Sequence, residues 1–238
     1  MTKLKAALLG TTIVVALAAS GGSAFAAKMG GVVVADAPST MMSGLYVSVF
    51  GGASLPNNVT GTYDSYGFTV PMSAGFLIGG AIGAQITDYA RAELELSYAR
   101  HSVNTSTPVS MWNDTYAGSG SVSTLYALGN IWFDLNTGTQ FTPYIGGGAG
   151  LAVVMPDVHV DYFGSDYDWT AGGIAPAAQF GAGVRMKVTD KVTFDVGYRA
   201  KAVFSNTWQE DPNGSASYAA KSMNWLDQTI QAGVSVGF

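Results

Sequence analysis

The chain has 238 residues, of which only 11% are charged, and its formal net charge is −5. It has no cysteine, so disulfides cannot stabilise it, and its acidic balance argues against a nucleic-acid partner, which needs clustered Lys and Arg. No segment after the N-terminal one has the roughly 18 uninterrupted apolar residues of a transmembrane helix. If the protein spans a membrane, it must therefore do so with strands.

The N-terminus has the features of a secretory signal peptide. Two lysines precede an apolar run over residues 6–19, and small residues flank a cleavage site after Ala26. We therefore predict a signal peptide over residues 1–26, whose removal leaves a formal charge of −7 because it carries two lysines and no acid. Residues 27–43 contain Gly and Pro and no sustained period, and we predict an exposed periplasmic lead-in there.

From Gly44 onward, apolar residues recur at every second position, which is the period of a β-strand with one apolar face. The clearest example is the segment from Phe180 to Phe204, where Thr189-Asp190-Lys191 forms a short polar link between two alternating runs. Eight alternating stretches are predicted, at residues 45–50, 76–86, 91–98, 125–135, 141–154, 180–188, 192–204 and 226–238.

The connections between these stretches alternate between short and long. Short links of a few residues alternate with polar stretches at 54–73, 101–120, 155–173 and 205–223, which we predict to be loops. An up-and-down meander places all short turns at one end and all long loops at the other, which is typical of an outer-membrane barrel. We predict an all-β fold, an eight-stranded antiparallel up-and-down transmembrane β-barrel over residues 44–238.

Charged residues of the predicted strands share the face opposite to the apolar one. A soluble barrel places its apolar residues inside, whereas strands that span a membrane turn them to lipid and must close into a ring. Five acids and five bases would then fill a narrow lumen and pair with one another. The alternative is a half-solvated soluble sheet with these charges in water. The predicted lumen residues are Arg91, Glu93, Glu95, Asp134, Arg185, Lys187, Asp195, Arg199, Lys201 and Asp227.

Three segments carry a resemblance to a known family. They are GAGVRMKVTDKVTFDVGYR from Gly181, TPYIGGGAG over residues 142–150, and the closing QAGVSVGF. They resemble the small outer-membrane β-barrel proteins, and among these the opacity-type and OmpA-like surface antigens often labelled "porin family". The resemblance implies contact with outer-membrane lipid and lipopolysaccharide, extracellular long loops and periplasmic short turns. It also implies that the barrel-assembly machinery recognises the last strand, through Ile230, Val234, Val236 and Phe238.

The sequence offers few candidates for chemistry. It has no nucleophile elbow, phosphate loop or metal-ligand spacing, so we expect no catalytic residue, cofactor or metal. Asp157-Val-His159-Val-Asp161 would place three polar side chains on one face, but the Asp-His pair of some outer-membrane proteases also needs a facing Asp-x-Asp, and we predict none on an opposing strand. His101-Ser102 is similar to the His and Ser of lipid A esterases, although adjacent strand residues point to opposite faces.

The predicted loops combine acids with aromatic residues. They could bind divalent cations, sugars or host ligands, and the interpretation that we favour is a solvated acidic crown. For the whole protein we expect a structural surface antigen with a charge-plugged lumen. The alternatives are a narrow porin and, third, an enzyme acting on lipid A or peptides. The loop acids are Asp64, Asp114, Asp157, Asp161, Asp166, Asp168, Glu210 and Asp211.

Overall fold

The computed structural model describes residues 44–63, 66–105, 109–111, 114–162, 165–210 and 219–238. The predicted signal peptide and lead-in lie outside these residues. Eight long strands are β1 (Leu45–Pro56), β4 (Gly75–Thr87), β5 (Ala90–Ser102), β7 (Asp114–Asp134), β8 (Phe141–Tyr162), β10 (Ile174–Lys187), β11 (Val192–Glu210) and β12 (Ala219–Gly237). Four short strands are β2 (Val59–Tyr63), β3 (Tyr66–Val70), β6 (Val109–Met111) and β9 (Ser165–Ala171). Within the described ranges, no helix is long and apolar enough to cross a membrane.

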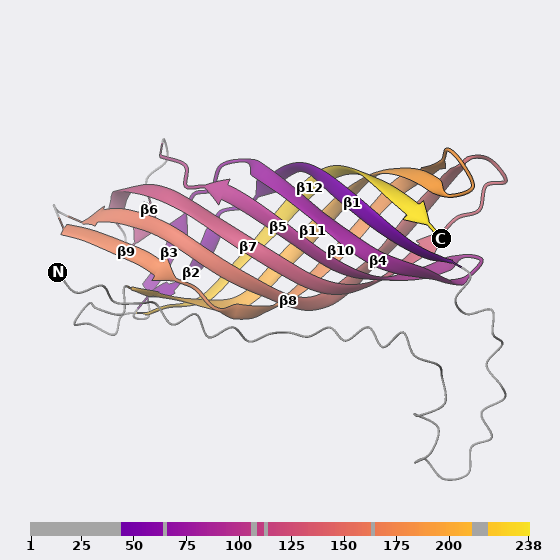
Figure 1. Cartoon of the computed structure of the whole chain (residues 1–238). Coiled ribbons are helices and arrows are strands. Elements are labelled where there is room, and N and C mark those ends of the chain that lie inside the picture. Colours follow the sequence, from indigo (N-terminus) through magenta and orange to yellow (C-terminus); the bar gives the residue numbers. More distant parts are fainter. Residues whose placement is uncertain (1–43, 64–65, 106–108, 112–113, 163–164, 211–218) are drawn as a thin grey trace, which may run out of the picture. The chain divides into compact units, whose positions relative to one another are not determined.

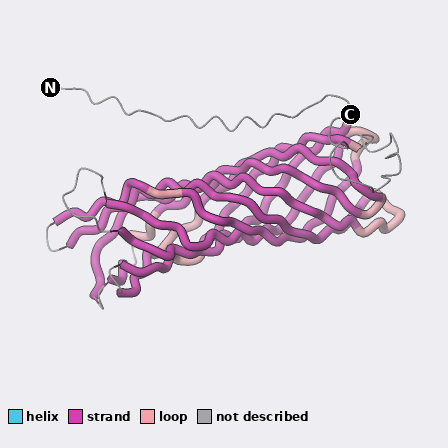
Figure 2. The backbone as a smooth tube through the Cα atoms, turned by 90° about the horizontal axis from the view of Figure 1, so that it is seen from below, coloured by secondary structure: helices cyan, strands magenta, loops and turns pink. Residues whose placement is uncertain are grey.

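The eight long strands form a closed antiparallel ring. Each pairs with the next long strand along the chain. The ring closes because residues 227–237 of β12 pair with residues 46–56 of β1, with Val47 opposite Val236 and Ala53 opposite Ile230. Figures 1 and 2 show the resulting barrel. The prediction of an all-β, eight-stranded, up-and-down barrel is confirmed.

One end of the barrel, which we call the turn end, carries three short connections and the C-terminus (Figure 1). In the connection after β7, Gly138 has a φ of 71°, which favours glycine, and its N–H donates to Asn136 Oδ1 at 3.0 Å. In the link between β10 and β11, the N–H groups of Lys191 and Val192 donate to Thr189 Oγ1 at 3.2 and 2.9 Å. Both links occupy the positions that the sequence predicts for turns.

The other end, the extended end, differs from the prediction of long loops. The described parts of those four stretches are mostly strand, because β1, β5, β7, β8, β11 and β12 continue into them and β2, β3, β6 and β9 add hairpins. Pairing runs in a second closed cycle, in the order β12, β2, β3, β6, β7, β8, β9, β11 and back to β12. The barrel wall is therefore extended by a second ring rather than by loops.

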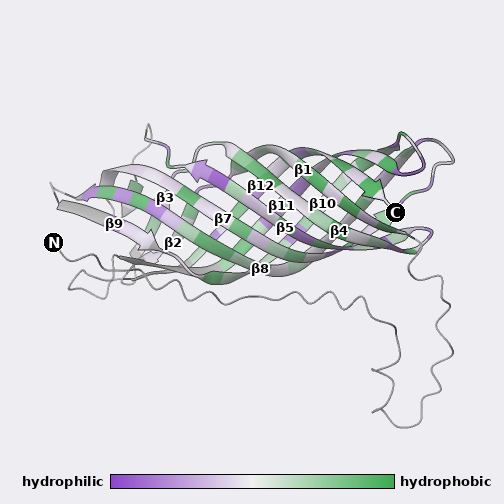
Figure 3. Ribbon diagram, viewed as in Figure 1, coloured by the Kyte–Doolittle hydropathy of each residue, from purple (hydrophilic) through white to green (hydrophobic). Residues whose placement is uncertain are grey.

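Over most of their length, the eight long strands turn apolar side chains outward. Phe194, Val196 and Tyr198 of β11 are each more than 40% exposed, while the alternating residues face the interior. The outward apolar residues of β11 run from Phe194 to Phe204, about the 9–11 residues with which a tilted strand spans a bilayer. Figure 3 shows the alternation as green and pale bands along the strands. These outward residues form a belt that suits lipid.

Both faces of the wall change character together toward the extended end. On β8, the outward residue Met155 is 42% exposed and belongs to the belt, whereas the next outward residue, Asp157, is polar and exposed. Inward, Val158 and Val160 are fully buried. The wall is thus apolar outside and polar inside near the turn end, and polar outside and apolar inside near the extended end. The second arrangement suits water, as in a soluble barrel.

The buried apolar residues of the extended half form one apolar cluster inside the barrel. Its members are Val59, Phe68, Val70, Met72, Leu77, Ala99, Val103, Val109, Tyr116, Val122, Tyr126, Leu128, Ala152, Val154, Val158, Val160, Trp169, Ala175, Ala177, Val203, Met223 and Trp225.

Candidate functional site

The barrel interior holds nine of the ten predicted lumen residues. In the half toward the turn end, inward charges from five of the long strands meet, and most of these side chains are buried. The interior residues, which we call the charge network, are Arg91, Glu93, Glu95, Asp134, Arg185, Asp195, Arg199, Lys201 and Asp227.

Lys187 is the exception. Its side chain is 60% exposed and its Nζ lies 3.0 Å from Asp190 Oδ1 in the turn between β10 and β11. It shares the face of the interior residues, but it is the last residue of β10, so it lies at the mouth of the barrel rather than inside. The prediction that Lys187 belongs to the lumen is therefore wrong. The interior retains four bases against five carboxylates.

Arg91 connects the charges nearest the turn end. Its Nε donates to both oxygens of Asp134 at 3.0 and 3.1 Å, and its Nη1 donates to Glu93 Oε1 at 2.6 Å. The Tyr46 hydroxyl and Trp132 Nε1 donate to the same Glu93 carboxylate at 2.6 and 2.8 Å. A charge-assisted set of this kind satisfies both carboxylates without water.

A second set surrounds Glu95 at mid-barrel. The Lys201 ammonium, fully buried, donates to Glu95 Oε1 and to Gln179 Oε1, the latter at 2.9 Å. Glu95 Oε2 accepts from Gln179 Nε2 at 2.7 Å and from Asn130 Nδ2 at 3.1 Å, and Ser97 donates to Oε1 at 2.7 Å. Four strands, β5, β7, β10 and β11, are thus joined through one carboxylate. The neutral partners Gln179 and Asn130 were not predicted.

Arg199 is held by aromatic rings rather than by a carboxylate. Its guanidinium carbon lies 3.7 Å from the centroid of the Trp132 ring, and its Nη2 donates to the Tyr144 hydroxyl at 3.2 Å. Gly183 and Gly197 make room for Tyr144, because a Cβ at either glycine would lie 2.5 Å from that hydroxyl. These two strand glycines therefore have a packing role in the interior.

Asp227 lies where the charge network meets the apolar cluster. It is fully buried and accepts a hydrogen bond from Ser54, while His101 Nε2 lies 2.9 Å from Ser54 Oγ and 3.4 Å from Asp227 Oδ1. The three residues come from β12, β1 and β5 and are far apart in the sequence. Sequence reasoning predicted Asp227 but missed its two partners, for which no local motif exists.

Two cavities mark how far the interior is open. One, of about 20 Å³, is lined by Arg91, Glu93, Asp195 and Arg199 among others, and it holds little more than one water molecule. The other, of about 410 Å³, is a vestibule at the turn end, lined by Tyr46, Arg185 and Phe238 among others. Arg185, whose Nη1 lies 3.5 Å from Asp134 Oδ2, belongs to the charge network and lines both cavities.

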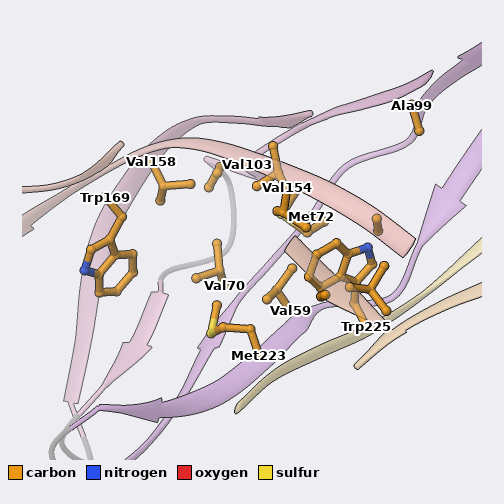
Figure 4. Packing of buried hydrophobic residues seen from close by; sticks show 14 of the residues in the cluster. Val59, Val70, Met72, Ala99, Val103, Val154, Val158, Trp169, Met223 and Trp225 are labelled. Carbon is orange, nitrogen blue, oxygen red and sulfur yellow. The ribbon is translucent and has the colours of Figure 1, made fainter. Parts of the chain in front are cut away.

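Beyond Asp227, the apolar cluster fills the interior. On β11, the next inward-facing residue after Lys201 is Val203. On β12, the inward-facing residue before Asp227 is Trp225. The interior therefore changes from charged to apolar over two residues of each strand. Figure 4 shows Val154 and Val158 facing Val59, Val70 and Met223 across the enclosed space. Two layers of different chemistry therefore occupy the barrel in series.

The catalytic candidates on β8 lie on the outer wall. Asp157, His159 and Asp168 are 63%, 45% and 44% exposed, with His159 Nδ1 2.6 Å from Asp168 Oδ1 and Nε2 3.4 Å from Asp157 Oδ1. Sequence reasoning missed Asp168 as the partner: β9 carries Asp166 and Asp168, in register with Asp161 and His159. This Asp-x-Asp lies on the adjacent strand and not across the barrel. Among the described residues, no group of three or more His, Cys, Asp or Glu is placed to hold a metal ion.

The four predicted assembly-signal residues lie on the outward face of β12. Ile230, Val236 and Phe238 are 59%, 43% and 69% exposed, and Val234 shares their face. The backbone N–H of Phe238 donates to the carbonyl of Leu45 at 3.1 Å, which fixes the end of the chain to β1.

Comparisons with known proteins agree with this geometry. The crystal structure of the outer membrane protein OprG from Pseudomonas aeruginosa is 11% identical, with a TM-score of 0.57, covering 83% of this chain and 98% of that one. The outer membrane protease OmpT from Escherichia coli is 8% identical, with a TM-score of 0.50, covering 83% and 97%. At these identities the likeness is one of fold.

The sequence comparisons point the same way. An uncharacterised protein of Brucella abortus strain 2308 is 26% identical over 169 residues, which are 59% of this chain and 55% of the relative, so the chain spans about half the length of the curated relatives it matches. The outer membrane protein beta-barrel domain matches residues 7–238. The chain therefore belongs to the outer membrane protein beta-barrel family, and its strands span the outer membrane.

Proposed function

We propose that this protein is a structural, surface-exposed antigen of the outer membrane whose barrel is closed to ions and solutes. The observation that carries the proposal is the stacking of the charge network and the apolar cluster in one lumen. An eight-stranded barrel is only wide enough for side chains to fill its interior, and here side chains of both kinds do so. The charged residues predicted from the sequence would form one plug, and the apolar cluster would add a second.

A narrow porin is the alternative, and the apolar cluster speaks against it. An ion that entered from the vestibule would first have to displace Arg185 from Asp134 and then cross a segment lined by Val203, Met223 and Trp225. Apolar constrictions exclude water and with it the hydration shell of an ion. The charge network alone could rearrange around a permeating ion, whereas the apolar cluster offers it no polar partner.

An enzyme acting on lipid A or peptides is the third candidate, and we propose no catalytic role. The outward position of Asp157 and His159 leaves them open to solvent, outside the barrel interior. His101, the other candidate, is bonded to Ser54 and lies against Asp227 in the interior, where a lipid or a peptide has no access. OmpT is a protease by its name, but its likeness to this chain is one of fold.

The proposal extends to the orientation and the partners, and the two ends of the barrel support it. We place the turn end in the periplasm and the extended end, with its polar outer wall, outside the cell, after export directed by residues 1–26. The outward face of β12 would be recognised by the barrel-assembly machinery. The belt would contact outer-membrane lipid and lipopolysaccharide, and the extended end would meet host or surface ligands.

Planar lipid bilayers test the proposal. The purified full chain, folded and inserted from detergent, should give no stable ion conductance at about 1 M KCl and moderate voltage. A known porin measured under the same conditions is the positive control. Insertion is verified by recovering the chain from the membrane in its heat-modifiable folded form. Reproducible single-channel steps from the wild-type chain would sink the closed barrel in favour of the porin.

A further inference from the structure

A polar patch lies on the outer wall of β5 and β7, at the edge of the apolar belt that faces the extended end. Arg100 is exposed there, and its Nη2 donates to Ser121 Oγ at 3.1 Å. The Tyr98 hydroxyl donates to Ser123 Oγ at 2.9 Å. We call Tyr98, Arg100, Ser121 and Ser123 the Arg100 patch. The long arginine and tyrosine side chains lie over the two serines, which are less than 10% exposed although they face outward.

Among the bases in the described strands, Arg100 combines an outward position on the wall with the lack of a carboxylate partner. Arg91, Arg185 and Lys201 each lie within ion-pair distance of an interior carboxylate, and Lys187 pairs with Asp190. Among the described residues, no carboxylate oxygen lies within ion-pair distance of the Arg100 guanidinium. A guanidinium has five N–H donors, so most of those on Arg100 are available to a ligand.

The level of Arg100 in the wall decides what meets it. Its cross-strand neighbour on β4 is Phe76, whose ring packs against the ring of Tyr98 at 6.2 Å, and both aromatic residues belong to the belt. The next outward residue on β5 is Ser102, beyond which the wall is polar. Arg100 therefore lies at the boundary where acyl chains end and headgroups begin, the usual position for an arginine that extends from an apolar surface toward charge.

We propose that the Arg100 patch binds the phosphate of a membrane lipid, with the acyl chains of that lipid lying against Phe76 and the belt. The proposal rests on the proposed function, because it names a lipid partner for the barrel in its membrane. Charge complementarity carries it: an unpaired guanidinium with adjacent hydroxyl groups offers a phosphate several donors in fork geometry. With the extended end outside the cell, the lipid is a phosphorylated glycolipid of the lipopolysaccharide type.

One carboxylate stands near the patch and helps to test it. Asp157 is the cross-strand neighbour of Ser121 on β8, and its side chain is 63% exposed. Its charge would repel a phosphate bound by Arg100. If the lipid were held through a divalent cation instead, the same carboxylate would be needed for binding.

Native mass spectrometry of the folded full chain in detergent tests the proposal, with diphosphoryl lipid A and its enzymatically dephosphorylated form as probes. Arg100→Ala should weaken retention of the diphosphoryl lipid by roughly tenfold, as expected for loss of a charge-assisted contact. Arg100→Lys should lie between the two, because an ammonium lacks the fork. Lys191→Ala, an exposed base at the turn end, should match the wild type, and Asp157→Asn should bind equally or more tightly.

Several results would overturn the proposal. These are equal retention by Arg100→Ala and wild type, equal retention of the two lipids, weaker retention by Asp157→Asn, and complete displacement of the lipid by inorganic phosphate. Each variant is first checked for heat-modifiable migration on a gel, and Arg100→Gln replaces Arg100→Ala if the latter fails to fold. The outcome is separable from the proposed function, since a conducting barrel could bind the lipid and a closed barrel could fail to.

Discussion

At the scale of single residues, substitution within the buried pair of Glu95 and Lys201 should lower the stability of the barrel strongly. Both side chains are almost completely removed from solvent, and Glu95 also accepts from three neutral residues. Removing one partner leaves an uncompensated charge, whereas replacing both with apolar residues of similar size is often close to neutral.

We therefore expect Glu95→Leu and Lys201→Met each to lower the free energy of unfolding by about 3–5 kcal/mol, and the double variant to recover part of this loss. Unfolding by urea in lipid vesicles, followed by tryptophan fluorescence, measures all three. The exposed Lys187→Met, which loses only its contact with Asp190, is the matched control and should change little. A double variant whose loss equals the sum of the two single losses would show that the pair is not coupled.

At the scale of elements, β8 contains the change of face within a single strand. Val158 points into the apolar cluster and is fully buried, while the adjacent His159 points outward and is 45% exposed. The same substitution at the two positions thus meets opposite environments. Val158→Ser should lower the free energy of unfolding by roughly 2 kcal/mol, because it removes buried apolar surface and buries a hydroxyl. His159→Ser should lower it much less.

Hydrogen exchange of the backbone amides checks this expectation. In Val158→Ser, the paired segments of β8 and β9 at the extended end should exchange faster, while the amides near the turn end keep their protection. In His159→Ser, both regions should resemble the wild type. If both variants exchanged alike at the extended end, the apolar cluster would not be what stabilises the second ring.

At the scale of the whole molecule, the sequence predicts the eight-stranded barrel, but it predicts loops where the extended end has strands. Both results have one physical reason. An outward apolar period identifies strands that face lipid, and it predicts all eight. Beyond Met155 the apolar period continues on the other face, at Val158 and Val160, because water now lies outside. A search for one constant apolar face ends the strand at that point and predicts a loop.

The sequence predicts which residues face the barrel interior. It does not predict their level along the barrel axis or their hydrogen-bond partners. Alternation places a residue on the inner face, which is why nine of the ten charges are where the sequence predicts them. Alternation does not say how far along the barrel a residue lies. Lys187 is the last residue of β10, so it lies at the mouth of the barrel although its face is the inner one. Nor does alternation identify neutral partners from distant strands, such as Gln179 for Glu95 or Ser54 for Asp227.

We propose that the membrane ends where the two faces of the wall exchange character, with the extended end outside the cell. The chain has no native cysteine, so single cysteines along the outward face of β8 can be labelled without background. On intact cells, a membrane-impermeant maleimide should label Asp157→Cys and Asp161→Cys and leave Leu151→Cys and Val153→Cys unlabelled. Uniform labelling along β8, or labelling of Lys191→Cys at the turn end in place of Asp157→Cys, would contradict the account.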